Sequence, residues 1–545
     1  MNQQSPLERF YHWESQTPKN LYLRQPVNDR WHEYSYQKAG DEIRRIAAAL
    51  KSLNYEPGTR IALLSKNCAH WIMADYAIWM AGYVSVPLYP TLTSKSITKI
   101  LDHSEAKAIF VGKLDGYEQQ REGISESIQK ISFPLYGIEE GLQWNDLIKK
   151  HDPIKENIVR NPEEMMTIMY TSGTTGMPKG VMINFKAMEF VVVNGIKKFK
   201  VRESKEHFFS YLPLSHIAER ILVQLIGTHA GSTINFAESL EKFAGNLQSV
   251  QPTIFLGVPR IWAKFQEGVM NKMPTLDTLL KIPLVNSTVR RLILKKLGLM
   301  KAKMCLTGAA PIPVASLKWF QKIGIEIHDI YGMTENLAYS HGNLPDVKFG
   351  TVGRAWDDIE VRLSAEGEIQ TRHPGHMMGY YKEPALTAEA FTEDGYLRTG
   401  DKAEMDADGY YRITGRIKDL FKTDKGKYIA PAPIEEKLSA NTDIDQVCVV
   451  GMGIPQPIAL IVLSPAGKAK SKEQIIESLS KTLTEVNTKL ENYEKLETGV
   501  IMHEAWTVEN NLMTPTLKIR RTDVEKIYLP HYPKWYAEKA LVVWE

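Results

Sequence analysis

Residues 165–180 read MMTIMYTSGTTGMPKG, a short apolar run followed by a loop rich in hydroxyls and glycine. Glycine frees the backbone to turn its N–H groups toward one anion. The Ser and Thr side chains add O–H donors, and Lys179 adds a positive charge. The loop is not of the GxxxxGK[ST] type, because Lys179 follows Pro178 and precedes a glycine. The composition indicates a phosphate-binding loop, and the alternative is an ordinary polar turn.

The bulk composition predicts a large, folded protein. The chain has 545 residues, of which 43% are hydrophobic, enough for two or three domains with a substantial core. The 67 Lys and Arg residues nearly balance the 64 Asp and Glu residues, which argues against a dedicated nucleic-acid binder. The three cysteines, Cys68, Cys305 and Cys448, are far apart, which predicts a reducing compartment without disulfides or a zinc site.

The sequence shows no sign of a signal peptide or of a membrane-spanning helix. The first residues, MNQQSPLERFYHWES, lack the apolar segment of a signal peptide. No stretch approaches the roughly 18 uncharged apolar residues of a membrane helix. We therefore expect a soluble, cytoplasmic protein.

Short apolar runs alternate with helix-length segments over the first three quarters of the chain, and one such segment, 69–82, is apolar nearly all round. This alternation predicts parallel strands covered by helices on both faces, a layered α/β architecture. The expected strands are 60–65, 84–89, 107–112, 166–171, 207–212, 253–258, 302–307 and 325–332.

The sequence texture changes at about residue 350. Alternating residues with Asp-Gly and Glu-Gly turns predict an antiparallel β region there. After a break at 416–420, the chain shows an α+β pattern with strands at 446–451, 458–463 and 499–504 and a long polar helix at 472–496. This pattern indicates a smaller C-terminal domain.

Four further stretches carry residues suited to nucleotide chemistry. Small residues in GAAPIP (308–313) would let a flat ring lie against the backbone, and Glu335 in YGMTEN (331–336) would suit Mg²⁺, which takes oxygen ligands. Asp401 and Arg416 lie close to the expected domain break, and Lys518 lies in a basic C-terminal loop. Taken singly, each of these is more often a tight turn or a solvated surface charge.

Taken together and in this order, these motifs strongly resemble the adenylate-forming (AMP-binding) superfamily of acyl-CoA synthetases. The resemblance runs from about residue 30 to 525 and includes YTSGTTGMPKG (170–180), YGMTE (331–335), the TGD and GRIKD segments (399–401 and 415–419) and TPTLKIRR (514–521). YLPLSHIAER (211–220), FLGVPRIW (255–262) and KTDKGKYIAP (422–431) are similar to the long-chain fatty acyl-CoA synthetase branch, in its compact bacterial and "bubblegum" forms.

The resemblance implies an α/β fold with a large N-terminal domain (1–415) of layered α/β subdomains and a small β-barrel-like region. A hinge (416–420), with Lys418 at the family's hinge position, would join it to a small mobile α+β C-terminal domain (421–545). The implied reaction uses a fatty acid, ATP and Mg²⁺ to form acyl-AMP and pyrophosphate. Coenzyme A then replaces AMP to give the thioester.

The resemblance also assigns roles to individual residues. Glu335 and Thr175 would support Mg²⁺, and Thr334 would touch the α-phosphate. His216 would lie beside the acyl carbonyl, with a satisfied core histidine as the alternative, and Lys518 would neutralise charge during adenylation. Trp262 is similar to a position near the acyl tunnel, although a large aromatic is more often plain core. The implied ligands of ATP and coenzyme A are the phosphate-loop residues Thr171, Ser172, Gly173, Thr174, Thr175, Gly176 and Lys179; Gly308, Ala309, Ala310 and Tyr331 at adenine; Asp401 and Arg416 at ribose; and Gly426 at the pantetheine tunnel.

Several alternatives stay open at this level. In the first alternative, the acyl group of acyl-AMP passes to a carrier protein instead of coenzyme A. In the second, the substrate is a medium-chain, aromatic or branched acid. A non-catalytic nucleotide-binding protein on the same fold is a third alternative. The basic stretch VRRLILKKLGLMKAK (289–303) would lie on an anionic membrane, or be a solvated surface helix, which we favour. GMGIPQ (451–456) is only part of a dinucleotide-binding pattern and carries no weight.

Overall fold

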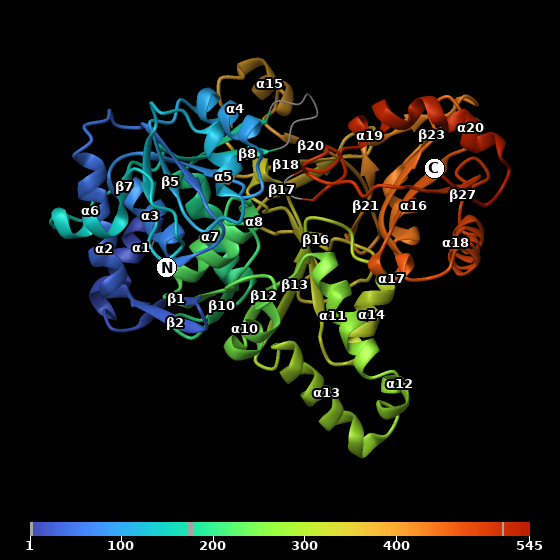
Figure 1. Ribbon diagram of the computed structural model, residues 1–545, viewed down its shortest axis with the longest axis horizontal. Coiled ribbons are helices and arrows are strands. Elements are labelled where there is room, and N and C mark those ends of the chain that lie inside the picture. The colour runs from blue at the N-terminus through green and yellow to red at the C-terminus, as the bar shows by residue number, and fades with distance from the viewer. Residues whose placement is uncertain (1–3, 172–177, 515–516) are drawn as a thin grey trace.

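The computed structural model describes residues 4–171, 178–514 and 517–545. Figure 1 shows a large N-terminal part, coloured blue to yellow, and a smaller C-terminal part, coloured orange to red, with the polypeptide crossing between them after β21 (Tyr411–Arg416). The longer helices are α1 (Pro6–Gln16), α2 (Tyr36–Lys51), α3 (Ala69–Met80), α4 (Ser94–Ser104), α7 (Phe185–Lys198), α10 (Phe243–Val250), α11 (Pro259–Lys272), α13 (Pro283–Leu297), α14 (Val314–Lys322), α16 (Pro431–Leu438), α18 (Lys472–Asn487) and α19 (Arg521–Tyr528).

An eight-stranded sheet forms the first layer of the N-terminal part. Its strand order is β19-β9-β8-β4-β3-β5-β6-β7, and the neighbours from β8 through β7 pair in parallel, whereas β9 and β19 are antiparallel. The four strands expected between residues 60 and 171 all lie in this sheet. The bounds are β3 (Arg60–Leu64), β4 (Val84–Leu88), β5 (Ala108–Val111), β6 (Gln129–Ser132), β7 (Leu142–Gln143), β8 (Met165–Thr171), β9 (Lys179–Asn184) and β19 (Gly379–Tyr380).

Both faces of this sheet are covered, as the near-continuous apolar strands predicted. Along β3, Ile61 and Leu63 belong to one buried cluster, whereas Ala62 and Leu64 belong to another on the opposite face. Because successive side chains of a strand point to opposite faces, each face therefore has its own core.

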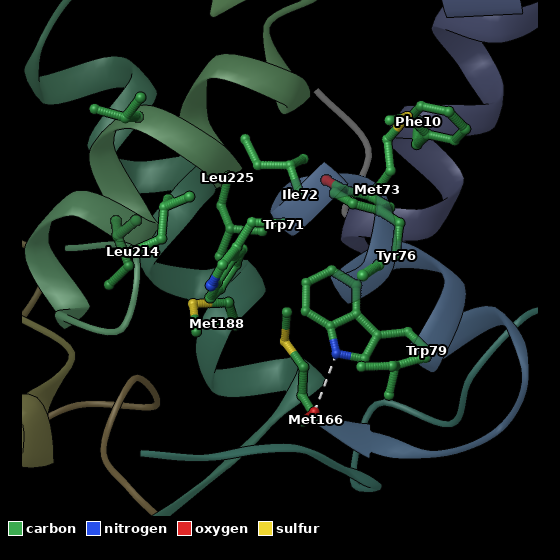
Figure 2. Close-up of a cluster of buried hydrophobic side chains, with 14 of the residues drawn as sticks. Phe10, Trp71, Ile72, Met73, Tyr76, Trp79, Met166, Met188, Leu214 and Leu225 are labelled. Carbon is green, nitrogen blue, oxygen red and sulfur yellow. Dashed lines mark hydrogen bonds between the residues drawn. The ribbon is translucent and has the colours of Figure 1, made fainter. Parts of the chain in front are cut away.

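Helix α3 explains the segment that is apolar all round. It contacts β3 and β4 of the eight-stranded sheet and β1 (Leu21–Val27) of a second sheet, so every side of it is buried. Figure 2 shows its side chains, among them Trp71, Tyr76 and Trp79, packed against Phe10 and Met188 from other helices. The indole of Trp79 also donates a hydrogen bond of 3.1 Å to the Met166 carbonyl of β8.

Two further sheets complete the layered α/β region. The second sheet has the order β10-β11-β1-β2, and the third has the order β12-β13-β14-β15-β16. The four strands expected between residues 207 and 332 are confirmed as β10, β12, β13 and β14. The bounds are β2 (Arg30–Ser35), β10 (His207–Ser210), β11 (Thr233–Phe236), β12 (Ile254–Leu256), β13 (Met304–Gly308), β14 (Ile327–Tyr331), β15 (His341–Gly342) and β16 (Arg354–Ala355).

The antiparallel region expected from residue 350 onward is a four-stranded sheet of order β17-β18-β20-β21. Within the described residues this sheet is open, and its strands do not close into a barrel. It ends at Arg416, directly before the 3₁₀ turn η4 (Ile417–Asp419). The other bounds are β17 (Glu360–Leu363), β18 (Glu368–Arg372) and β20 (Leu397–Met405).

The C-terminal part has its own mixed sheet, β24-β25-β26-β27, after the small hairpin β22–β23. The helix expected over 472–496 is shorter, because α18 ends at Asn487. There the Asn487 side chain bonds both backbone groups of Leu496, donating to its carbonyl at 2.9 Å and accepting from its N–H at 2.8 Å, which folds the chain back. The bounds are β22 (Phe421–Lys422), β23 (Tyr428–Ile429), β24 (Ile444–Val450), β25 (Ile458–Leu463), β26 (Gly499–Ile501) and β27 (Val542–Trp544).

No helix within the described ranges has both the length and the apolar character needed to span a bilayer.

Candidate active site

The predicted phosphate loop connects two antiparallel strands. Thr171, the last residue of β8, lies opposite Lys179, the first residue of β9. The loop between them, with the predicted ligands Ser172, Gly173, Thr174, Thr175 and Gly176, lies outside the described residues. Because a strand follows the loop instead of a helix, the hairpin itself would present the loop.

Glu335 is a buried carboxylate close to this hairpin. It lies in the 3₁₀ turn η3 (Thr334–Asn336), just after β14, and is 8% exposed. The Tyr380 hydroxyl donates a hydrogen bond of 2.8 Å to Glu335 Oε1. Lys179 Nζ lies 5.1 Å from the centroid of the same tyrosine ring. Tyr380 of β19 therefore joins Glu335 and Lys179, a role that no sequence motif indicated.

Asp401 is the second buried carboxylate of the site. It lies opposite Arg416 in the β20–β21 pair, and Arg416 Nε donates to Asp401 Oδ1 at 2.8 Å. The Tyr331 hydroxyl, at the end of β14, donates to Asp401 Oδ2 at 2.7 Å. The attraction of Asp401 raises the pKa of Arg416. The predicted ribose and adenine residues are thus hydrogen-bonded to one another.

The predicted adenine-binding backbone lies beside Tyr331. Gly308, the last residue of β13, pairs in register with Ile330 of β14, and a Cβ on Gly308 would come within 2.8 Å of the Ile330 carbonyl oxygen. Ala309 follows in the left-handed region with φ of 67°, and Ala310 is exposed. These residues and Thr334 lie at the carboxyl ends of neighbouring strands, where α/β sheets bind ligands.

Lys518 comes to this cleft from the C-terminal part of the chain. Its charge acts on Arg416, Asp401 and Glu335, and also on His216. The residue is exposed, yet surrounding protein desolvates its charge and lowers its pKa, with repulsion from Arg416 as the next cause. Lys518 therefore lies close enough for its charge to interact with residues more than a hundred positions earlier in the chain.

Charged side chains of both signs lie around Lys179 and Arg416. Desolvation lowers the pKa of Lys179, and the nearby Lys418 of η4 lowers it further. Three further carboxylates act on these cations, so Lys179, Arg416, Lys418 and Lys518 are accompanied by Glu335, Asp401, Glu383, Glu389 and Asp419. Cations that repel one another in a partly desolvated cleft favour a polyanionic ligand.

His216 lies at the start of α8 (Ile217–Glu219), where its Nδ1 accepts a hydrogen bond of 3.3 Å from the Ala218 N–H. Burial lowers the pKa of His216 to about 4, and Lys518 is the second cause. The imidazole is therefore neutral at pH 7. Because Nδ1 is the acceptor, the ring proton is on Nε2, which makes Nε2 a donor.

Two predicted residues lie elsewhere. Gly426, with φ of 76°, lies in the turn between β22 and β23 of the C-terminal part, and no hydrogen bond among the described residues links it to the cleft. Trp262 is fully buried and packs against Phe255 and Phe320, with its indole donating to the Leu306 carbonyl at 3.3 Å. These contacts agree with a plain core residue.

A narrow apolar cavity adjoins the cleft, with about 30 Å³ of free space. Its walls come from α7, from the segment after His216 and from the residues flanking Tyr331 and Glu335. The lining residues are Val191, Gly195, Phe199, Ala218, Ile221, Leu222, Ile226, Ile330, Leu337, Ala338, Tyr339 and Trp356.

Known proteins resemble this chain over nearly its whole length. The sequence of the long-chain-fatty-acid–CoA ligase ACSBG2 of Xenopus laevis is 27% identical to this chain, covering 95% of the chain and 81% of the relative. The long-chain-fatty-acid–CoA ligase FadD15 of Mycobacterium bovis is 25% identical, with 94% and 95% covered. The crystal structure of the anthranilate CoA ligase AuaEII with anthranoyl-AMP matches the fold with a TM-score of 0.79 at 22% identity, over 97% of this chain and 98% of that one. Structures of ATP-bound MatB from Rhodopseudomonas palustris give 0.77 at 20% identity, over 97% and 99%.

Two family models also match, and together they span most of the sequence. The model of the AMP-binding enzyme matches residues 10–381, and the model of the AMP-binding enzyme C-terminal domain matches residues 418–540. With its main model covering well over half of its length, this chain belongs to the AMP-binding enzyme family.

Proposed function

We propose that this protein is an ATP-dependent long-chain fatty acid–CoA ligase. The observation that carries the proposal is that Lys518, from the C-terminal part, interacts electrostatically with Glu335, Asp401 and Arg416 of the N-terminal motifs. The named activity of the relatives supports the substrate class. In the first step a carboxylate oxygen bonds to the α-phosphorus of ATP, and the bond to pyrophosphate breaks. In the second step the thiol of coenzyme A displaces AMP from the acyl carbonyl.

The charges of the cleft suit the first step. The carboxylate and the triphosphate are both anions, so their approach needs neutralisation. Lys179 would neutralise the terminal phosphates, because it borders the phosphate loop, and Lys518 would neutralise charge at the reacting α-phosphate. Asp401 would accept hydrogen bonds from the ribose hydroxyls, and the ring of Tyr331 would flank adenine above the Gly308–Ala310 backbone.

Glu335 fits the role of a Mg²⁺ ligand. Within the described ranges, no three acidic, His or Cys side chains gather as a metal cage. Mg²⁺ bound with a nucleotide needs only one or two carboxylates, because phosphates and water complete its shell. Glu335 offers one buried hard oxygen ligand beside the phosphate hairpin, and Thr175 would add another. The bound ion would supply further neutralisation of the triphosphate.

The apolar cavity would accept the first part of the acyl chain. Its lining includes Ala218, two residues after His216, whose Nε2–H would donate to the acid, and it has no charged lining residue. Its free space of about 30 Å³ holds little more than one water-sized molecule, so a long chain enters by moving flexible side chains such as Leu222. Gly195→Val should narrow the cavity, because a Cβ there meets Ile226 at 2.8 Å, and should shift the preference to shorter acids.

The second step would need a rearranged C-terminal domain. We propose domain limits of 1–415 and 421–545, with a hinge over 416–420 centred on Lys418, which lies in the short turn η4 between the sheets of the two parts. Rotation there would withdraw Lys518 and bring the turn at Gly426 toward the cleft, where glycine permits close approach to the pantetheine chain.

The test is a panel of straight-chain, branched and aromatic acids of increasing length, with pyrophosphate exchange measured first and thioester formation with coenzyme A second. We expect the highest exchange with acids near hexadecanoic acid and thioester product with free coenzyme A. Exchange without thioester product would indicate a carrier-protein acceptor. Binding of ATP without any exchange would indicate a non-catalytic protein and contradict the proposal.

We also propose a peripheral contact with anionic membranes through the region 259–303. Figure 1 shows α12 (Leu276–Leu279) and α13 projecting from the body of the protein. The region has ten Lys or Arg and two Asp or Glu residues, although the whole chain has a net charge of +3. Val289 and Ile293 of α13 are buried, but Met270, Ile282 and Leu292 are exposed. Basic and apolar side chains together fit a lipid surface.

Flotation with phosphatidylglycerol-containing vesicles tests this contact. We expect binding that falls with salt and is lost when Arg291, Lys295 and Lys296 are changed to Glu. Reversal of Lys481, Lys489 and Lys534, exposed on the C-terminal part, is the matched control. Equal flotation of both triple variants would contradict the proposal.

A further inference from the structure

The loop that carries His216 runs from Tyr211 to His216, between β10 and α8, and a side chain from a distant part of the chain holds it. Asn67 lies in the segment between β3 and α3 and is 7% exposed. Its Nδ2 donates to the Leu212 carbonyl at 2.5 Å, and its Oδ1 accepts from the Leu214 N–H at 3.0 Å. One amide therefore fixes both a carbonyl and an N–H of this loop.

A second side chain holds the same loop from its start. Glu219, in the first turn after His216, is fully buried. Its Oε1 accepts three hydrogen bonds, from the Tyr211 N–H at 3.0 Å, from Ser210 Oγ at 2.9 Å and from Asn67 Nδ2 at 3.3 Å. Asn67 and Glu219 thus bond each other, and together they hold the backbone of Tyr211, Leu212 and Leu214.

Burial of the Glu219 carboxyl group costs free energy, because the group loses its hydration. Burial raises the pKa of Glu219 to about 8, so a proton is bound over much of the neutral range, and Oε2 has no partner among the described residues. The three donors need only the acceptor oxygen Oε1. A glutamine would supply the same acceptor without the charge.

We infer that Asn67 and Glu219 are positioning residues that hold His216 in the orientation needed for adenylation, an inference that rests on the proposed ligase function. Neither side chain touches the proposed site of ATP. They act through the loop backbone. The loop backbone fixes the position of the His216 Cα and therefore the direction of its Nε2–H. A misplacement of about 1 Å at such a group costs on the order of 10²-fold in rate.

The buried ion pair behind the loop provides a matched control. Arg220 Nη2 donates to both oxygens of Asp75 at 2.8 Å and to Ser85 Oγ at 2.9 Å, and all three side chains are fully buried. The side chains of this network make no bond to the loop, although the Arg220 backbone N–H donates to the His216 carbonyl at 3.1 Å. Ser85→Ala therefore removes a buried hydrogen bond of similar kind without releasing the loop.

The experiment compares pyrophosphate exchange with hexadecanoic acid in Asn67→Ala, His216→Ala and the double variant, beside thermal unfolding of each. We expect Asn67→Ala to lower kcat about 10- to 100-fold, with an unchanged KM for ATP. The double variant should lose no more than His216→Ala alone, because residues that act through one another are not additive. Glu219→Gln should keep most of the rate, whereas Glu219→Ala should lose it, and Ser85→Ala should lower only the unfolding temperature.

A wild-type rate in folded Asn67→Ala, or a double variant whose losses multiply, would overturn the inference, as would an unaffected His216→Ala. Glu219→Ala leaves Asn67 in place and gives the same comparison if Asn67→Ala does not fold. Wild-type protein without any exchange would instead contradict the proposed function.

Discussion

The two walls of the cleft are held very differently. On the N-terminal wall, Glu335 and Asp401 are buried, and each accepts a hydrogen bond from a tyrosine. The opposite wall contributes Lys518 from an exposed loop. Among the ion pairs of the described residues, Arg260–Asp445 alone joins the chain before 416 to the chain after 420. The comparison teaches that Glu335 and Asp401 are held by their own part of the chain, whereas Lys518, the proposed cation for adenylation, lies on a part that one ion pair of the described residues joins to it.

Removing the exposed cation should have the largest effect. We expect Lys518→Ala to lower acid-dependent pyrophosphate exchange about 10²- to 10³-fold, because one preorganised charge would be lost at the reacting phosphate. Lys481→Ala, an exposed lysine of α18, serves as the control. A reduction below threefold would remove Lys518 from the chemistry.

Substitution of the buried carboxylate Glu335 should instead change how pyrophosphate exchange depends on the Mg²⁺ concentration. Glu335→Gln keeps the size of the side chain but removes its charge, so the Mg²⁺ concentration for half-maximal exchange should rise at least about tenfold. The measurement is a magnesium titration at constant ATP, with the exposed Glu393→Gln as the control. Superimposable titrations of Glu335→Gln and wild type would exclude Glu335 as a ligand.

Removing a hydrogen bond to Glu335 while keeping its charge should lower the rate of pyrophosphate exchange by a smaller factor. Tyr380→Phe removes the donor to Glu335 Oε1 but keeps the ring beside Lys179, and exchange should fall about tenfold. Tyr396→Phe removes a similar bond of 2.8 Å to Glu360 at the surface and should have little effect. Equal rates for the two variants would show that the bond to Glu335 has no special role.

The ion pair between the two walls should have the smallest effect. Arg260 Nη2 lies 3.1 Å from Asp445 Oδ1, and Arg260 is about half exposed, so the pair contributes about 0.2–1 kcal/mol. Arg260→Ala should therefore slow exchange at most about fivefold. The exchanged pair Arg260→Asp/Asp445→Arg should recover the rate, and failure of this recovery while both single variants are slow would contradict a role in domain orientation.

Much of the fold followed from short-range patterns. Runs such as RIALLS and MTIMYT are largely apolar, and they form β3 and β8 because both faces of the sheet are covered. The end of α18 did not follow, because Asn487 ends the helix by bonding Leu496, a contact nine residues away that no helical periodicity reveals. The antiparallel region was predicted as strands, but whether such strands close into a barrel depends on pairings that sequence periodicity does not set.

The sequence predicted those site residues that lie within recognisable motifs. Glu335, Asp401, Arg416 and Lys518 lie in motifs and meet in the cleft. Tyr380, Asn67 and Glu219 were missed, because each acts through a contact with a segment far away in sequence. Glu219 had one signal, since it is a carboxylate next to an arginine within the mostly apolar segment HIAERILVQL (216–225), which is too apolar for a surface helix.

The most direct test of the account supplies preformed hexadecanoyl-AMP and coenzyme A to Lys518→Ala and to wild type. The account predicts thioester formation by the variant within about threefold of wild type, because Lys518 would act only while the acyl–phosphate bond forms and other groups serve the thiol step. Loss of this second step to the same extent as the first, in a variant with unchanged thermal unfolding, would contradict the claim that Lys518 acts in adenylation and not in thioester formation.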